Sequence, residues 1–319
     1  MRNIKRIIIL LFLFVFLITL VSCSAGNKKY DLKLKYKTGE VYELEIVIEQ
    51  RHKLELVHLE DTLDVYGKIT TKFIETVEEI DADGNILIHR KYDAIKSIQK
   101  NGPLKIEYDS ENLPDEIPQI VIPFHDLIGL EFKKKINEKG EILEVFEIEE
   151  ILKKRQAKLK KRYPDLDEMI LEKMMEGIEK NYAPENLGGP LKHYSVLRQD
   201  KPISVGYKWI AEVKTGPPLP IIIETEYHFK EKKNDILLIV IKSTFESAPE
   251  SEQMKNMWIY NVKGTESGII KIDKDTGIIV DSKIYRRIEG TVTMKIKDED
   301  AICPMLQETT IIMRTKKIK

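Results

Sequence analysis

Apolar and charged residues alternate with a period of two along much of this chain, a pattern that indicates β-strands with one buried face. In the first such segment the even-numbered positions are apolar and the odd-numbered positions are mainly charged: Tyr42, Leu44, Ile46 and Ile48 alternate with Glu43, Glu45, Val47 and Glu49. Strand periodicity continues over residues 69–77, 86–98, 121–136 and 141–148. Turn sequences at 81–84 and 137–140 separate neighbouring segments. We therefore expect an antiparallel meander over residues 30–148.

The period changes to that of a helix between residues 149 and 182. The first part has an apolar stripe opposed by a basic set over residues 153–162, and Pro164 ends it. The acidic sequence at 165–168 is typical of the start of a second helix. The apolar stripe of that helix consists of Leu166, Met169, Ile170, Met174 and Ile178. We expect a two-helix insert over residues 149–188.

Strand periodicity returns after the helices and repeats landmarks of the first half. Gly206–Trp209 matches Gly39–Tyr42, since each has a glycine followed three residues later by an aromatic residue that opens a strand. Lys274–Ile279 likewise resembles Asn137–Ile142. The sequence thus predicts an α+β protein, mostly antiparallel β, with two related β lobes separated by the helical insert. Each lobe could curve into a half-barrel.

The N-terminus has the features of a lipoprotein signal peptide. Basic residues within 2–6 precede an apolar run over 7–21. The run ends at Leu20, Val21, Ser22 and Cys23, where a small residue before a cysteine favours cleavage and lipid attachment to the thiol. The alternative is an uncleaved membrane helix, but the run is shorter than the roughly 20 residues that cross a bilayer. The expected divisions are a signal peptide (1–22), a lipidated tether (23–29), the first β lobe (30–148), the helical insert (149–188) and the second β lobe (189–319).

Export limits where this chain can act and what it can meet. Loss of the three basic residues of the signal peptide lowers the formal net charge from -1 to -4, so we expect no nucleic-acid partner. Lipidation of Cys23 leaves Cys303 without a disulfide partner, either as a small core residue or as a reactive thiol. We expect a chain anchored in the bacterial cell envelope by its acyl chains. Ser24, rather than aspartate, follows the cysteine, and the resemblance to lipoproteins of enteric Gram-negative bacteria then implies the outer membrane; otherwise we expect the outer face of the cytoplasmic membrane.

No arrangement of side chains in the sequence predicts catalysis, a metal site or a cofactor. Ser97 and Lys100 have the spacing of a serine–lysine pair, but residues three apart on a strand face opposite sides. The six histidines lack the spacing that zinc requires. Carboxylates at 273–277 have calcium-like spacing, yet Ile284 stands where the ligand glutamate belongs, which favours a hairpin turn. The basic set at 153–162 could meet anionic head groups, although its acidic neighbours favour a solvated helix face.

Several strand and turn motifs resemble those of a domain family of unknown function that is common in bacterial lipoproteins. These motifs are Lys37–Tyr42 soon after the signal, Val205–Trp209 and Asp275–Gly277. They imply a fold rather than a chemistry. More loosely, long antiparallel strands with a helical insert resemble the periplasmic half-barrel carriers of lipids and lipoproteins. That resemblance implies an apolar ligand on a concave sheet face.

We therefore expect a membrane-anchored protein that binds an apolar ligand and is not an enzyme. The alternative is a structural or assembly lipoprotein that binds another envelope protein. Met169 and Met174 on the second helix are candidate ligand contacts, because methionine side chains adapt to varied apolar shapes. Ordinary core packing is the alternative role for these two methionines. An open apolar groove would favour the binding protein, and a closed core would favour the assembly role.

Overall fold

The computed structural model describes residues 28–57, 60–164, 167–180, 182, 194, 196–215, 221–248, 258–296 and 299–319. The signal peptide and the lipidation motif, Leu20, Val21, Ser22 and Cys23, lie outside these residues. So do residues 165 and 166, where the second helix was expected to begin.

The described strands and helices follow one another in a β-rich order. The first half contains β1 (Lys29–Tyr30), β2 (Val41–Leu56), β3 (Asp61–Ile80), β4 (Ile86–Asn101), β5 (Leu104–Asp109), η2 (Gln119–Val121), α2 (Ile122–His125), β6 (Glu131–Ile136) and β7 (Ile142–Phe146). Next come α3 (Ile148–Arg162) and α4 (Glu168–Lys180). The second half contains β8 (Ile203–Ser204), β9 (Lys208–Lys214), β10 (Ile221–Lys233), β11 (Ile236–Ser247), β12 (Trp258–Asp273), β13 (Ile279–Ile296) and β14 (Glu299–Lys317).

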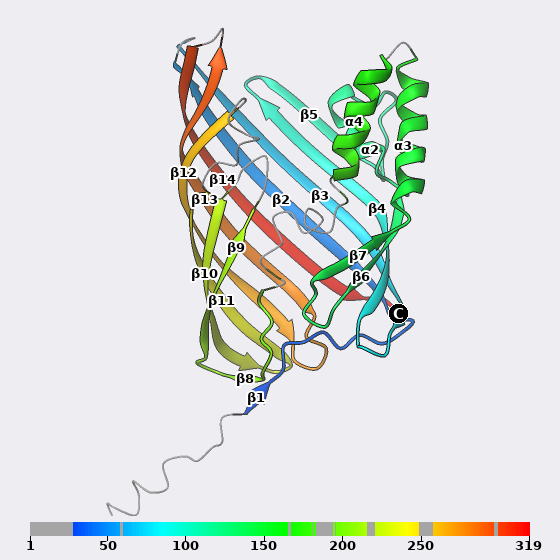
Figure 1. Cartoon of the computed structure of the whole chain (residues 1–319), viewed down its shortest axis with the longest axis vertical. Helices are drawn as coiled ribbons and strands as arrows, with labels where there is room; N and C mark the ends of the chain where they lie inside the picture. Colours follow the sequence, from blue (N-terminus) through cyan, green and yellow to red (C-terminus); the bar gives the residue numbers. More distant parts are fainter. Residues whose placement is uncertain are drawn as a thin grey trace, which may run out of the picture.

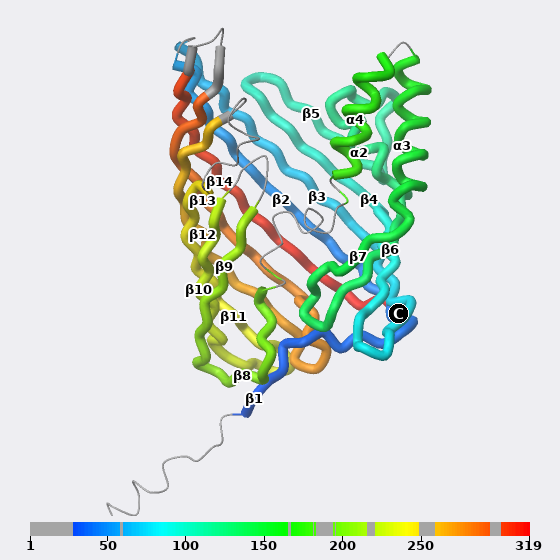
Figure 2. The backbone as a smooth tube through the Cα atoms, viewed as in Figure 1, coloured from blue at the N-terminus to red at the C-terminus, as the bar shows by residue number. Residues whose placement is uncertain are grey.

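One 12-stranded sheet holds the long strands of both halves (Figure 1). Its order is β7-β6-β4-β3-β2-β14-β13-β12-β11-β10-β9, and β5 also pairs with β4. The sheet curves into a cradle, and the tube in Figure 2 shows its two margins standing apart. The sheet is not closed, because β7 and β9 at its ends do not pair with each other. The two predicted β lobes therefore meet where β2 pairs with β14 and share one continuous sheet.

The prediction of a mostly antiparallel α+β protein is confirmed. In both halves most consecutive strands of the large sheet lie side by side, although β6 pairs with β4 rather than with β5, and the similar turns at 137–140 and 274–277 join β6 to β7 and β12 to β13. A shared origin of the two halves stays a prediction, since simple meanders recur in unrelated proteins.

The expected strand over residues 121–136 is wrong in its first part. A 3₁₀ turn (η2) and the short helix α2 occupy this stretch, and β6 begins only at Glu131. Pro123 lies in the first turn of α2, where its missing N–H costs nothing, whereas in a strand it would remove a ladder hydrogen bond. The sequence reading also missed β5, which forms a hairpin with β4 through Gly102 at φ +55°.

The alternating sequence gives the sheet an apolar concave face and a charged convex face. Residues directly opposite on neighbouring antiparallel strands share a face. Leu44 is opposite Phe73, and both are buried on the concave side. Glu45 lies on the convex side, where Arg314 of β14 contacts it at 2.7 Å. The concave core includes Leu44, Phe73, Tyr227, Ile241, Ile284 and Ile311.

Two segments far apart in the sequence close one end of the cradle, at the bottom of Figure 1. Residues 28–37 and 196–203 pair through β1 and β8. Leu32, Leu197 and Ile203 from these segments pack into the concave core. We call this part of the molecule the closed end.

Arg198 connects two hairpin turns at the closed end. Its Nη1 atom donates a hydrogen bond to the carbonyl oxygen of Lys139 (3.1 Å), and its Nη2 atom donates one to that of Gly277 (3.0 Å). These carbonyls belong to the turns that resemble each other in the two halves. Burial lowers the pKa of Arg198 to about 10, because the described residues offer it backbone carbonyls but no carboxylate.

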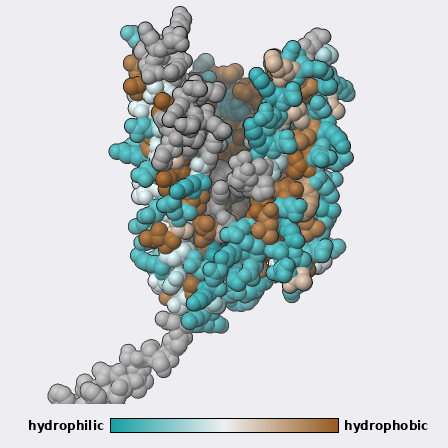
Figure 3. Space-filling model, in the orientation of Figure 1, coloured by the Kyte–Doolittle hydropathy of each residue, from teal (hydrophilic) through white to brown (hydrophobic). Residues whose placement is uncertain are grey.

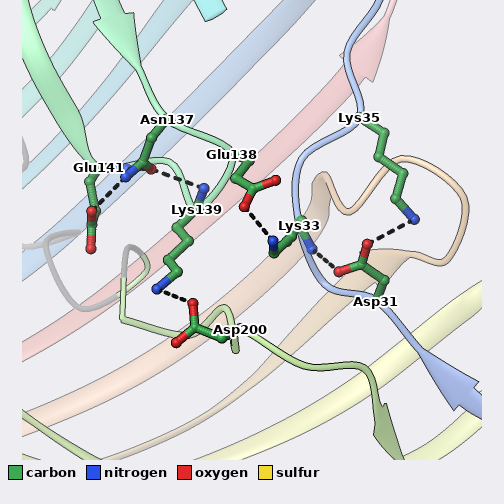
Figure 4. A network of polar contacts seen from close by, with 8 residues as sticks. All are labelled: Asp31, Lys33, Lys35, Asn137, Glu138, Lys139, Glu141 and Asp200. Atoms are coloured by element: carbon green, nitrogen blue, oxygen red, sulfur yellow. Dashed lines mark hydrogen bonds and ion pairs between the residues drawn. The ribbon is translucent and has the colours of Figure 1, made fainter. Parts of the chain in front are cut away.

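Surface contacts join the same segments (Figure 4). Lys33 contacts Glu138, and Lys139 contacts Asp200 at 2.6 Å. Exposed ion pairs of this kind contribute about 0–1 kcal/mol each. The backbone contributes more directly here, because the amide of Leu34 donates to the carbonyl oxygen of Glu138 at 2.7 Å.

The helical insert covers the concave side of the sheet near β6. Ile151 of α3 packs against Phe132, whose side chain faces inward from β6. Arg162 at the end of α3 binds Asp126 through Nη1 at 2.7 Å, so part of the basic set serves to hold α3 against the α2 region. At the start of α4, the carboxylate of Asp167 accepts the backbone N–H of Met169 at 2.9 Å. None of the described helices has the length and apolar character needed to span a membrane.

Candidate functional site

On β2 and β3 the concave face is buried near the closed end and more exposed toward the other end. On β2 and β3 near the closed end, the opposed pair Leu44 and Phe73 is 7% exposed at each residue. Ten residues further along β2, on the same face, Leu54 is half-buried and its partner Leu63 is 39% exposed. The register places both pairs on one apolar face, so that face continues past the packed core toward solvent.

A row of polar residues crosses the concave face. On β10–β13 the face beyond this row is still buried, as at Ile223, Phe245 and Ile288. Each member of the row is directly opposite the next on the neighbouring strand, so all point to the same side of the sheet. From β10 to β4 the row consists of Thr225, Ser243, Glu266, Arg286, Thr309, Gln50, Gly67 and Gln99. We call this set the polar row.

The buried part of the polar row is hydrogen-bonded from strand to strand. Arg286 Nε and Nη2 lie 3.0 and 2.8 Å from Glu266 Oε2, and the Arg286 guanidinium also stacks over the Phe245 ring at 5.1 Å. Ser243 donates to the other oxygen of Glu266 at 3.2 Å, and the hydroxyls of Ser243 and Thr225 are 2.9 Å apart. The carboxylate and the guanidinium therefore neutralise each other inside the wall of the cradle.

Two glycines flank Glu266 on the same face and permit this arrangement. A Cβ atom at Gly264 would collide with the carbonyl oxygen of Arg287, and one at Gly268 would lie 2.6 Å from that of Lys283. Strands β12 and β13 thus approach closely on the concave side around Glu266. This close approach helps the sheet to curve.

Beyond the polar row, on β2, β3 and β5, the concave face is less buried than on β10–β13. We define the open half by its apolar residues Leu54, Leu63, Val65, Leu104 and Met305 and its polar residues His52 and Gln307. Figure 3 shows the molecule hollowed between the wall of β9–β12 and the helices, with hydrophobic residues visible inside the hollow. Such a concave surface, apolar with a few polar groups, is typical of a small-molecule binding site.

Next to the polar row the polar groups of the open half are uncharged, whereas Asp61 lies at its outer rim opposite Leu56. His52 Nε2 lies 3.1 Å from Gln50 Oε1, and burial lowers the pKa of His52, which favours its neutral form. Gln307 Nε2 donates to Thr309 Oγ1 at 3.2 Å. Among the described residues the Gln99 amide has no hydrogen-bond partner, so it can bind a ligand or water.

A second buried polar cluster lies on the concave face nearer the helices. Arg90 Nε and Lys134 Nζ lie 2.6 and 2.8 Å from Glu75 Oε1. Burial alone raises the pKa of Glu75, but the two cations outweigh it and bring it down to about 2. Burial and the neighbouring Arg90 lower the pKa of Lys134 to about 8. This cluster contacts the Phe73 ring through Arg90, at 4.7 Å, and connects β3, β4 and β6.

The structure places the two candidate methionines on the surface of α4. Met169 is 61% exposed and Met174 is 40% exposed, whereas Leu171 between them is buried. Core packing is therefore wrong as their main role. Ligand contact stays a proposal.

The other candidates from the sequence do not form a catalytic or metal site. Ser97 is buried on the concave face, whereas Lys100 stands over the Tyr66 ring on the convex face, as strand geometry predicts. Asp273 accepts backbone N–H groups of its own hairpin turn. Cys303 is buried and unpaired. Among the described residues no cluster of three or more potential metal ligands was found.

Sequence reasoning missed the polar row, although the sequence carries a signal for it. Arg286 stands between Ile284 and Ile288 in the apolar phase of its strand, and Glu266 stands between Gly264 and Gly268. A charged residue in the buried phase of an alternating strand is costly unless it is paired. The partner could not be identified without the register.

Comparisons with known proteins give a family and distant structural likenesses. Residues 83–279 match a family described as "Family of unknown function (DUF6263)". No curated protein matches the sequence. A lipovitellin structure described by its lipid–protein interactions has 8% identity and a TM-score of 0.46; the match covers 88% of this chain and 25% of that one.

Two further structures are more distant still. The translocator domain of the autotransporter NalP from Neisseria meningitidis has 6% identity and a TM-score of 0.21, with 88% of this chain and 90% of that chain covered. OpdQ from Pseudomonas aeruginosa has 5% identity and a TM-score of 0.19, with 89% and 100% covered. Likenesses at these scores say nothing about what the present chain binds.

Proposed function

This chain belongs to the DUF6263 family of unknown function, and we propose that it is a membrane-anchored protein that holds an apolar ligand in the open half of its concave face. The observation that carries this proposal is the continuation of the apolar face from the buried pair Leu44 and Phe73 to the half-open pair Leu54 and Leu63. Exposed apolar surface costs about 25 cal/mol per Å², and a bound apolar ligand removes that cost.

The anchor would orient the cradle relative to the membrane. In this proposal Cys23 carries the lipid, and the first described residue, Lys28, leads directly into β1 at the closed end. Five residues span at most about 18 Å. The closed end would therefore face the bilayer, and the open half would face away from it. The half-open apolar face also favours this function over a purely structural role, for which a closed core was expected.

Photoaffinity labelling of the full chain in bacterial membranes tests the proposal. The probe is a long-chain alkane that carries a diazirine and a terminal alkyne, and the labelled peptides are identified by mass spectrometry. We expect labels on β2, β3 and β14 at residues of the concave face. Labels confined to the N-terminal tether or to the convex face would count against the proposal.

Two neighbouring positions on β2 give a matched pair of variants. Leu54→Trp fills the open half, whereas Glu55→Trp adds the same bulk to the exposed convex face one residue away. Labelling of the concave face should fall about tenfold in Leu54→Trp, which corresponds to about 1.4 kcal/mol, and should be unchanged in Glu55→Trp. Equal labelling of the two variants would mean that the ligand does not occupy the open half.

A further inference from the structure

We infer that the ligand of the open half is a lipid whose head group is uncharged and forms hydrogen bonds, with the head at the exposed members of the polar row and the chain along Leu54, Leu63 and Leu104. This inference rests on the proposed function and specifies the class of ligand. It follows from the pairing of the charged residues of the polar row with each other and from the position of that row at the inner limit of the open half.

The only full charges in the polar row neutralise each other. Arg286 directs Nε and Nη2 to one oxygen of Glu266, and Phe245 covers its guanidinium. The Ser243 hydroxyl donates a hydrogen bond to the second carboxylate oxygen of Glu266. A charged head group would have to break this pair or enter the cradle without a counter-charge, and both routes are costly in a desolvated site.

The exposed members of the row offer neutral donors and acceptors instead. Gln50 and Gln99 lie on either side of Gly67, which has no side chain, so a gap separates the two amides across β3. A Cβ atom added at Gly67 would meet nothing within 4 Å, which shows that this gap is open. The Gln99 amide can both donate and accept. A hydroxyl or ester placed over Gly67 would be able to reach the amides on both sides.

The remaining lining of the open half is apolar and suits a hydrocarbon chain. Leu54 and Leu63 are opposite each other, and Leu104 at the end of β5 is strongly exposed on the same face. These residues lie on the side of the polar row away from the closed end. A head group at Gly67 would therefore direct its chain toward the open rim.

Three photoaffinity probes that differ only in the head group test the inference on the full chain in membranes. Their heads are a glycerol ester, a carboxylate and a quaternary ammonium, and the head-free alkane serves as the reference. We expect the uncharged head to label the concave strands at least about tenfold more than either charged head. Equal labelling by the carboxylate would overturn the inference while leaving the proposed function intact. Failure of all four probes, the alkane included, would remove both.

Variants at two neighbouring positions of β4 sharpen the test. Gln99→Arg places an unpaired cation at the inferred head-group position and should transfer the preference to the carboxylate probe. Ile98→Arg places the same charge on the convex face and should leave the preference unchanged. Gln99→Leu adds no charge and should lower labelling by the glycerol ester to the level of the alkane. A Gln99→Arg protein with unaltered thermal unfolding and unaltered preference would contradict the inference.

Discussion

Glu266 and Arg286 face each other from adjacent strands of the concave face, with Arg286 Nη2 2.8 Å from Glu266 Oε2 and the Glu266 side chain fully buried. The two residues are opposite in the register of β12 and β13. Their pairing allows two charges to lie inside an otherwise apolar wall, and it removes their net charge from the proposed binding surface.

Removal of one partner should be more harmful than removal of both. Arg286→Met leaves a buried carboxylate without a cation and should lower the free energy of unfolding by about 3–5 kcal/mol. The double variant Glu266→Gln with Arg286→Met leaves no buried charge and should recover a large part of that loss. Urea denaturation followed by circular dichroism measures both. If the double variant is less stable than Arg286→Met, the carboxylate is stabilised by something other than this pair.

Glu75 should make stability depend on pH in the acid range. Because the pKa of its carboxyl is about 2 in the folded protein and 4.5 in the unfolded chain, the ionised form stabilises the fold above pH 4.5. That contribution is lost as the pH falls through 4.5 toward 2, and it amounts to about 3 kcal/mol in total. The difference in stability between the native protein and Glu75→Gln should therefore shrink over this range. A difference that stays constant from pH 6 to pH 2 would show that Arg90 and Lys134 do not hold the charge of Glu75.

Alanine substitutions in α4 should separate surface methionines from the helix core. Met169→Ala should change the free energy of unfolding by less than about 0.5 kcal/mol, because its side chain is largely in solvent, and Met174→Ala, at a less exposed position, by less than about 1 kcal/mol. Leu171→Ala, at a buried position of the same helix, should cost about 2–5 kcal/mol. If the methionines contact ligand, their double variant should lose alkane-probe labelling while its thermal unfolding stays native. Unchanged labelling would assign them to the solvated surface alone.

Lipidation of Cys23 can be tested separately from ligand binding. Cys23→Ser should abolish metabolic labelling with an alkyne fatty acid and move the chain out of the membrane fraction. Cys303→Ser is the matched control, since Cys303 is buried in β14 and should take no lipid. A Cys23→Ser chain that still carries the fatty acid would place the anchor elsewhere.

Local sequence was sufficient to predict most strands, both helices and several turns. Alternation assigned Leu44 and Glu45 to opposite faces of β2, and the Asp-Gly turn at 81–84 formed with Gly84 at φ +82°. These features depend on interactions within a few residues, such as turn geometry and the separation of apolar from charged side chains. The prediction failed over 121–136 because Pro123 lies within a short apolar run, where helix and strand periodicity are hard to distinguish.

Alternation along the chain specified which side chains share a face within each strand, whereas the folded arrangement specified which strands are neighbours and in what register. Glu45 and Arg314 are 269 positions apart, yet they are in contact because β2 and β14 join the two halves. The polar row exists for the same reason: Glu266, Arg286 and Gln50 become members of one row only through the pairing of successive strands. Alternation does not specify which strand pairs with which. The pairing and its register depend on long-range hydrogen bonding and on the turns between strands. The open half likewise follows from how far the closed-end segments reach along the sheet, which no local pattern encodes.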